Sequence, residues 1–301
     1  MSGYFSIMGG LGWLANSIKA NAPDLPTMVE VTGGRGELVW ITQKYKNEII
    51  NDKDENLIRL HEIVVRLTDT TIKELGEKYD FILDEQVYEG MKGADVATLG
   101  DSDFLYTYLY LFAGGKHGDE IFKDVFMPTL QGKSFRRTLL ALRQTAQRFT
   151  DIVFENLDAV EVLEKYDNPN TFFFIDPPYP SRERYYRIHD LDWAELRRTL
   201  TQLAGSWMLI SDISLSPRVG TSIRNKERLR YIIDSHNDLI QLLSQYPHRI
   251  FVEPFRMGFS NLDFKDRLKT YAMITNYPLA SDPIQIPLGV EEVSIAKDVI
   301  K

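Results

Sequence analysis

The sequence predicts an α/β fold in which a Rossmann-like, mostly parallel sheet carries an inserted, mostly helical region. Three observations support this prediction. The run Thr171–Ile175 is apolar or β-branched at every position, which is typical of a strand buried on both faces. A glycine-rich turn at residues 32–36 follows an early strand-like run. Residues 62–150 are helical where they are periodic, and a segment of that length is not a loop.

The first elements alternate between strand and helix. In order, we expect a strand at Met28–Val31, a glycine-rich turn entering a helix over Thr32–Trp40, a strand at Asn47–Asp52 and helical spacing over Glu55–His61. Glycine lets a ligand approach the backbone closely, and the amides that begin the next helix can face its polar end. An acid about twenty residues after such a turn is the usual arrangement for binding ribose hydroxyls. Asp52 is therefore the first candidate for that role and Asp54 the second.

The second half of the chain supplies the other strands as short apolar runs. They are expected at Ile152–Glu155, Thr171–Ile175, Trp207–Asp212, Arg249–Glu253 and, as the last strand, Tyr271–Ile274. The proline-containing residues from 278 onward predict a packed or partly loose tail. We therefore interpret residues 1–61 and 151–301 as one domain, interrupted by the insertion at residues 62–150.

Composition excludes several classes of protein. A chain of 301 residues with 44% hydrophobic content is long enough for one large domain with an insertion. It contains no apolar run long enough to cross a bilayer and no basic-apolar signal at its start, so a cytoplasmic location is expected. The absence of cysteine excludes disulfides, thiolate–metal sites and cysteine nucleophiles.

The most informative motif follows the buried strand Thr171–Ile175 and reads Asp176-Pro177-Pro178-Tyr179. The two prolines remove two backbone donors, so the chain leaves the sheet directly after the acid. Asp176 is thereby placed at the carboxyl end of a strand, where open α/β sheets bind their ligands. The alternative is an Asp that caps the next helix, followed by a rigid Pro-Pro turn.

This motif resembles the catalytic motif of S-adenosylmethionine-dependent methyltransferases that modify exocyclic amino groups of nucleic-acid bases. The resemblance implies that Asp176 and the carbonyl of Pro177 accept the two N–H bonds of the amino group, that Pro178 completes the turn, and that Tyr179 stacks on the base. A paired base must be flipped out of the duplex to reach such a site. No metal is required, because the sulfonium already activates the methyl group.

The order of the motifs is similar to that of the Dam-like adenine-specific DNA methyltransferases, with the cofactor motif first and the catalytic motif last. The similarity runs from Met8-Gly9-Gly10 to the strand ending near Tyr277. It implies site-specific transfer of a methyl group to adenine N6 in double-stranded DNA, with a cognate restriction endonuclease as a further partner. The residues it assigns to S-adenosylmethionine are Met8, Gly9, Gly10, Glu30, Gly33, Gly34, Asp52 and, near the adenine amino group, Asp158. For Asp158, capping of the following helix is the alternative.

Two departures from this family keep other functions open. Leu11 stands where the family usually carries a lysine, and Val31-Thr32 stands where it carries Pro-Phe. The role of the lysine beside the cofactor carboxylate could pass to Arg35. One alternative is therefore a nonenzymatic nucleic-acid-binding subunit with the same fold. Independently of these departures, an amino-methyltransferase of the same chemistry that acts on cytosine or RNA is a second alternative.

The net charge of −8 opposes binding to phosphates, so the distribution of basic residues matters. The candidate DNA contacts are Arg182, Arg184 and Arg187, next to the catalytic motif, and Arg136 and Arg137 in the insertion. Apolar residues at 135, 139, 140 and 142 favour an ordinary amphipathic helix for the second group. The aromatic residues at 104, 106, 108, 110 and 112 are expected to form a helix core rather than to contact bases.

Overall fold

The computed structural model describes residues 14–80, 84–91, 96–113, 139, 142–143, 146–180, 188, 190–213, 226–254, 268–280 and 291–293. Within these residues the strands are β1 (Thr27–Glu30), β2 (Asn47–Asn51), β3 (Val153–Glu155), β4 (Thr171–Ile175), β5 (Ser206–Asp212), β6 (His248–Pro254), β7 (Leu268–Thr275) and β8 (Glu291–Val293). They form one sheet in the order β3-β2-β1-β4-β5-β7-β6-β8. All seven strands expected from the sequence are confirmed.

The sheet has the connectivity of a doubly wound α/β fold. Strands β3, β2, β1, β4 and β5 are parallel, and β7 joins β5 in the antiparallel direction. The chain order reverses beside β1, because β2 lies on one side of it and β4 on the other. Such a switch point is where α/β sheets bind ligands at the carboxyl ends of their strands. The predicted Rossmann-like class is therefore confirmed.

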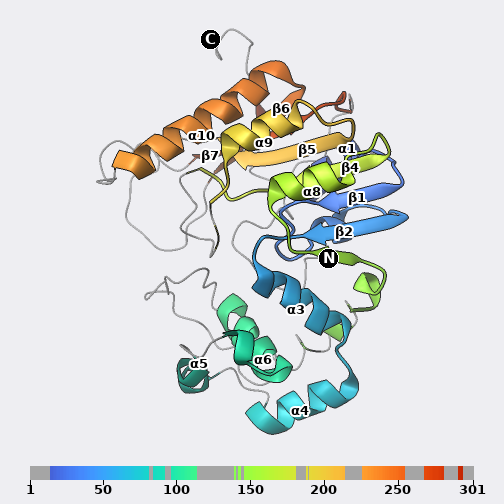
Figure 1. Cartoon of the computed structure of the whole chain (residues 1–301), viewed down its shortest axis with the longest axis vertical. Helices are drawn as coiled ribbons and strands as arrows, with labels where there is room; N and C mark the ends of the chain where they lie inside the picture. The colour runs from blue at the N-terminus through green and yellow to red at the C-terminus, as the bar shows by residue number, and fades with distance from the viewer. Residues whose placement is uncertain are drawn as a thin grey trace.

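The helices are α1 (Ala15–Asn21), α2 (Leu38–Ile41), α3 (Glu55–Val65), α4 (Asp69–Tyr79), α5 (Glu85–Met91), the 3-10 turn η2 (Val96–Thr98), α6 (Asp101–Ala113), α8 (Ala159–Tyr166), α9 (Trp193–Leu200) and α10 (Lys226–Gln245). Helices α8, α9 and α10 cover one face of the sheet (Figure 1). Residues of α1 and α2 pack on the other face. None of the helices among the described residues combines the length and apolarity needed to cross a lipid bilayer.

Alternation along β4 shows how the sheet divides these two cores. Phe173 and Ile175 point toward α8, α9 and α10, whereas Phe172 and Phe174 point toward α1 and α2. All five residues of β4 are buried, as the apolar run predicted. Burial on both faces fixes the register of β4, and with it the position at which Asp176 leaves the sheet.

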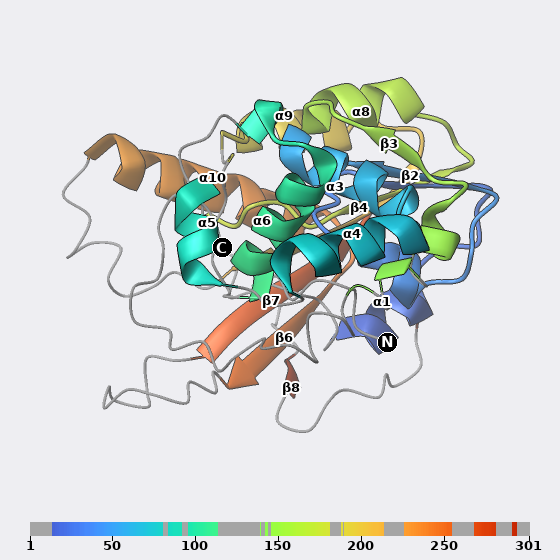
Figure 2. The ribbon, with the colours of Figure 1, turned by 90° about the horizontal axis from the view of Figure 1, so that it is seen from below.

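Helices α4, α5 and α6 lie together beyond the β2 side of the sheet, with α3 between them and the strands (Figures 1 and 2). Their core contains Phe104, Tyr106 and Tyr108, so the expected aromatic helix core is confirmed for these residues. Leu139 and Leu142 are buried in the same cluster, as the amphipathic alternative predicted. The division of the chain into one domain, residues 1–61 and 151–301, and an insertion, residues 62–150, stays a prediction.

One feature of the tail was not expected. The sequence predicts Tyr271–Ile274 as the last strand, but β8 pairs with β6 as a further antiparallel strand. This strand has three residues, Glu291-Glu292-Val293, and two of them are charged. A run that short and that polar gives no periodic signal, so backbone pairing alone reveals it.

Candidate functional site

Three acids stand at the carboxyl ends of three neighbouring strands. Glu30 ends β1, Asp52 follows β2 and Asp176 follows β4. Because β2, β1 and β4 are adjacent and parallel, these acids share one edge of the sheet at its switch point. The loop between β1 and α2, which contains Gly33, Gly34 and Gly36 and is called the glycine loop below, lies at the same edge.

The motif Asp176–Tyr179 is held by two hydrogen bonds, one to the glycine loop and one within the motif. The amide of Asp176 donates to Oγ1 of Thr32 at 3.0 Å, and the hydroxyl of Tyr179 donates to Oδ1 of Asp176 at 2.7 Å. Residues 176–180 are not helical, and α9, the next helix described, is capped by Asp192. The alternative in which Asp176 caps the next helix is therefore wrong for the helices that the structure describes.

Tyr179 is buried rather than presented to solvent. Its side chain is 4% exposed, and its ring meets that of Tyr271 edge-on at a centroid distance of 6.0 Å. Pro177 is buried as well. The motif is thus a packed turn in which the acid is only partly covered, so a substrate would reach Asp176 before it reached the face of Tyr179.

Burial raises the pKa of Asp176 to about 7, and the nearby charge of Glu37 acts in the same direction. The Tyr179 hydroxyl and the positive charge of Arg35 oppose this increase in pKa. Arg35 is itself paired with Glu37 at 2.7 Å, and both side chains are largely buried. Asp176 can therefore change its protonation state near neutral pH, which is typical of a functional acid.

Glu30 is the second carboxyl with a shifted titration. Its side chain is 3% exposed, and burial raises its pKa to about 8, with Glu37 and Asp176 adding to the increase. Oε1 accepts the amide of Leu38 at 3.0 Å, whereas Oε2 has no hydrogen-bond partner among the described residues. The amides that begin α2 were expected to face the polar end of a ligand. The first of them, that of Leu38, instead donates to Glu30.

The glycine loop lies directly against β2. The amide of Gly33 donates to the carbonyl of Asn51 at 2.6 Å. A Cβ at Gly33 would lie 2.9 Å from that carbonyl oxygen, so only glycine fits. Gly34 has φ +50°, and a Cβ there would meet no atom within 4 Å. The loop is therefore anchored on its inner side and open at Gly34, as close approach of a ligand to the backbone requires.

Asp52 and Asp54 have different roles in the structure. Asp52 accepts the amide of Gly34 through Oδ2 at 2.8 Å and the amide of Asp54 through Oδ1 at 2.8 Å. Asp54 is the N-cap of α3 and accepts the amide of Asn56 at 3.0 Å. Of the two ribose candidates, Asp52 is thus the one that borders the glycine loop.

Asp158 begins α8 with a reciprocal capping box that includes Glu161. Its carboxylate also binds Nζ of Lys53 at 2.9 Å, and the same Nζ binds Asp190 at 2.9 Å. The capping alternative for Asp158 is therefore confirmed, and its cofactor role stays a prediction. Lys53 follows Asp52 and binds Asp158, so it joins the end of β2 to the start of α8. Capping of α8 by Asp158 is therefore compatible with a cofactor role at this edge of the sheet.

Several predicted site residues lie outside the described residues. They are Met8, Gly9, Gly10, Leu11, Arg136, Arg137, Arg182, Arg184 and Arg187. Their assignments stay predictions.

Three contacts near the loop were not anticipated from the sequence. Thr32 holds Asp176, as described above. His61 of α3 binds the carbonyl of Gly34 at 2.7 Å. Arg148 pairs with the buried Glu48 and also donates to the carbonyl of Val39 in α2 at 3.1 Å. In the sequence, each of these residues is only a polar residue among apolar ones. That pattern does not show which atom its side chain contacts.

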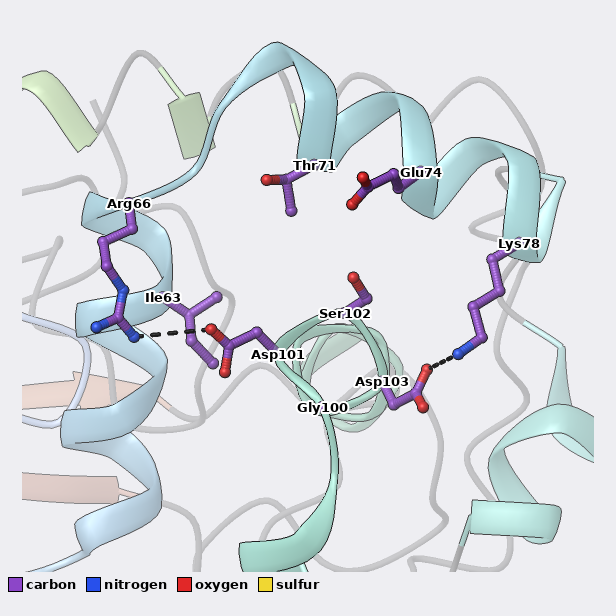
Figure 3. A pocket seen from close by; sticks show the side chains of 9 residues that line it. All are labelled: Ile63, Arg66, Thr71, Glu74, Lys78, Gly100, Asp101, Ser102 and Asp103. Atoms are coloured by element: carbon purple, nitrogen blue, oxygen red, sulfur yellow. Dashed lines mark hydrogen bonds and ion pairs between the residues drawn. The ribbon is translucent and has the colours of Figure 1, made fainter.

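A cavity of about 370 Å³ lies among α3, α4 and α6 (Figure 3). Figure 3 shows Arg66 directed toward Asp101 and Lys78 directed toward Asp103, and each pair is in ion-pair contact. None of the three strand-end acids lines it. Its positive charges are engaged by aspartates, so the cavity offers no anion site and is separate from the candidate active site.

Comparison with family models gives a match over more than half of the chain. The family model described as D12 class N6 adenine-specific DNA methyltransferase matches residues 9–195. These residues include the glycine loop, Asp52 and the complete catalytic motif. No curated protein matches the chain.

Two solved structures show weaker similarity. A Staphylococcus aureus protein described as a caffeoyl-CoA O-methyltransferase has 10% identity and a TM-score of 0.37, over 90% of this chain and 85% of its own. The plantazolicin methyltransferase BamL, in complex with a triazolic desmethylPZN analog and SAH, has 9% identity and a TM-score of 0.33, over 88% and 82%. At these scores the alignments add nothing to the topology described above.

Proposed function

Because the matched residues make up more than half of its length, the chain belongs to the D12 class N6 adenine-specific DNA methyltransferase family, and we propose that it methylates adenine N6 in double-stranded DNA. The general activity is methyl transfer, with S-adenosylmethionine as the donor. The observation that carries the proposal is the position of Asp176, a partly buried acid at the switch point, tied through Thr32 to the glycine loop.

The residues at this edge of the sheet fit the donor. Its methionine and sulfonium portion carries net positive charge, which would favour ionisation of Glu30 and Asp176, the carboxyls with raised pKa values at neighbouring strand ends. The open side of Gly34 can receive it against the backbone, and Asp52 retains acceptor capacity for ribose hydroxyls. When bound, S-adenosylmethionine supplies an activated methyl group, so the protein has mainly to position the acceptor and exclude water.

Asp176 acts on the acceptor nitrogen. The lone pair of an adenine amino group is delocalised into the ring, which makes the nitrogen a poor nucleophile. Acceptors at the Asp176 carboxylate and the Pro177 carbonyl favour a pyramidal nitrogen with its lone pair free for the methyl group. The new N–C bond would form as the methyl–sulfur bond breaks, with its electron pair left on sulfur. The nitrogen then loses one proton, and Asp176 can accept it because its pKa lies near 7.

Base flipping is part of the proposal, since the amino group is paired inside a duplex. Stacking of Tyr179 on the flipped base requires the ring to leave its contact with Tyr271 and its hydrogen bond to Asp176. Release of that hydrogen bond would also free Oδ1 of Asp176 for the amino group. Entry of the base and activation of the acid would thus occur together.

The DNA contacts are proposed on charge alone. Arg182, Arg184 and Arg187 follow the motif in sequence, and Arg136 and Arg137 belong to the insertion proposed as the target-recognition region. A cognate restriction endonuclease is a further proposed partner. Because its substrate would be cellular DNA, we expect the protein in the cytoplasm.

The test is to incubate the purified protein with duplex DNA and labelled S-adenosylmethionine, digest the product and identify the methylated nucleoside by mass spectrometry. We expect N6-methyladenine from the wild type and none from Asp176→Ala. Cofactor affinity of the variant, measured by calorimetry, should stay within a few fold. N4-methylcytosine, or methylation of RNA alone, would contradict the adenine assignment. Failure of the wild type to bind the cofactor would favour the nonenzymatic subunit.

A further inference from the structure

His61 connects the glycine loop to the helix that follows β2. It lies on α3, where its side chain is 1% exposed. Its Nε2 is 2.7 Å from the carbonyl oxygen of Gly34. Since a carbonyl only accepts, Nε2 must carry the proton. The amide of the same glycine donates to Asp52, so both polar atoms of the Gly34 backbone are held by side chains.

The imidazole is fixed in place by aromatic rings. It stacks on Phe154 of β3 with an interplanar angle of 4° and a centroid distance of 5.5 Å. The ring of Phe149 is tilted against the imidazole at a centroid distance of 5.8 Å and also lies against Gly36, where a Cβ would be 3.2 Å from the Phe149 ring. Burial lowers the pKa of His61 to about 4. The ring is therefore neutral at physiological pH and serves as a fixed single donor to the loop.

We propose that His61 is a positioning residue for cofactor binding: its hydrogen bond to the Gly34 carbonyl holds the glycine loop in the conformation that receives S-adenosylmethionine. This inference rests on the proposed function, which places the cofactor at that loop. Gly34 has φ +50° and no atom within 4 Å of the position of a Cβ, so steric packing does not fix its peptide groups and its two hydrogen bonds must do so. Asp52 accepts the N–H of Gly34 and so fixes the peptide group before this residue. His61 donates to the carbonyl of Gly34 and so fixes the peptide group after it.

Loss of the His61 donor should therefore lower the fraction of molecules whose glycine loop has the binding conformation. If the carbonyl of Gly34 is free to rotate, only a fraction of molecules has the binding conformation, and the apparent Kd increases by the inverse of that fraction. A buried hydrogen bond whose loss leaves one partner unsatisfied corresponds to roughly a 5- to 100-fold change in such an equilibrium. Once the cofactor is bound the loop is restored, so the maximal rate should change little.

Two substitutions at this position separate the hydrogen bond from the packing. His61→Phe keeps an aromatic ring against Phe154 and Phe149 but removes the donor. His61→Gln removes the ring but places an amide N–H at a similar distance from the backbone. Leu242→Ala, in the core on the opposite face of the sheet, serves as a control that lowers stability without touching the loop.

The measurements are S-adenosylmethionine affinity by calorimetry, thermal stability, and hydrogen–deuterium exchange of residues 32–41. We expect His61→Phe to raise the Kd at least 5-fold and to speed exchange in this segment, with kcat at saturating cofactor within 2-fold of wild type. His61→Gln should restore the Kd to within about 2-fold. Leu242→Ala should lower the melting temperature and leave both the Kd and exchange at the loop unchanged.

The inference is overturned if His61→Phe binds the cofactor as tightly as the wild type, or if His61→Gln is as weak as His61→Phe. In the first case the ring has only a packing role, and in the second the donor is not what matters. Failure of the proposed function looks different. A wild type that binds S-adenosylmethionine but yields no N6-methyladenine would contradict the adenine substrate, while the binding series would still decide the role of His61.

Discussion

Asp176→Asn should make the protein more stable and less active, and the gain in stability should depend on pH. The native pKa of Asp176 is about 7, against 3.8 for a solvated aspartate. Three pKa units correspond to at most about 4 kcal/mol, the cost of keeping the ionised carboxylate in the folded state. The side chain is only partly buried, so water offsets part of this cost. About 2 kcal/mol is the expected gain on replacement by the neutral amide.

The sign follows from proton binding. Between about pH 4 and pH 7 the folded state holds a proton on Asp176 that the unfolded state has lost. The free energy of unfolding therefore falls as the pH rises through this range, and Asp176 destabilises the fold most at high pH. Melting curves should therefore show Asp176→Asn above the wild type by about 4 °C at pH 8, with the difference vanishing toward pH 4. Glu30 acts in the same direction, because the charge of Asp176 contributes to its raised pKa.

Activity provides the second half of the assay. Wild-type single-turnover transfer should increase with pH through about 7, as Asp176 ionises, and then level off. Asp176→Asn should be at least about tenfold slower and lose this dependence, because an amide oxygen is a weaker acceptor than a carboxylate. Equal melting temperatures at pH 8, or a stability difference that grows toward low pH, would refute the reasoning.

Three further perturbations test the surrounding site. Asp52→Ala should weaken S-adenosylmethionine binding by about 10-fold or more, because charge-assisted bonds are worth about 1.5–3 kcal/mol each; unchanged calorimetric affinity would remove Asp52 from the site. Replacing Arg182, Arg184 and Arg187 together by Ala should flatten the salt dependence of DNA affinity by about one unit per lost phosphate contact, with cofactor binding retained; an unchanged slope would return the role to the basic residues of the insertion. Glu48→Gln should destabilise the fold by about 3 kcal/mol in urea titrations, because it leaves a largely buried arginine without its charged partner; a loss below about 0.5 kcal/mol would contradict this.

The sheet was predictable because most of its strands are buried on both faces. Runs such as Thr171–Ile175 and Trp207–Asp212 combine continuous apolar character with short length, and the structure places both where expected. β8 lacked that signal, since its pairing depends on the position of β6 rather than on its own side chains. Periodicity therefore identified the strands that carry the core and missed the one at the sheet edge.

The site was predictable only in part, for a related reason. Residue type and spacing pointed to Asp176 and Asp52, because glycine turns and strand ends determine where such acids lie. They ranked Asp52 before Asp54 as the ribose candidate but did not reveal that Asp54 is the cap of α3, because the two acids are two residues apart and chemically alike. The hydrogen bond from the Asp176 amide to the Thr32 hydroxyl oxygen joins residues far apart in sequence, and no local pattern encodes such a contact.

Thr32 also changes what the departure from the family pattern means. A residue that replaces an aromatic side chain beside the glycine loop looks, in sequence, like the loss of a cofactor contact. In the structure its hydroxyl oxygen accepts a hydrogen bond from the amide of Asp176, so the loop is joined directly to the proposed catalytic acid. Asp52 and His61 hold the same loop from β2 and α3. A loop fixed from three sides argues for a retained binding site, because a subunit that had lost its cofactor would have no need to restrain an open glycine.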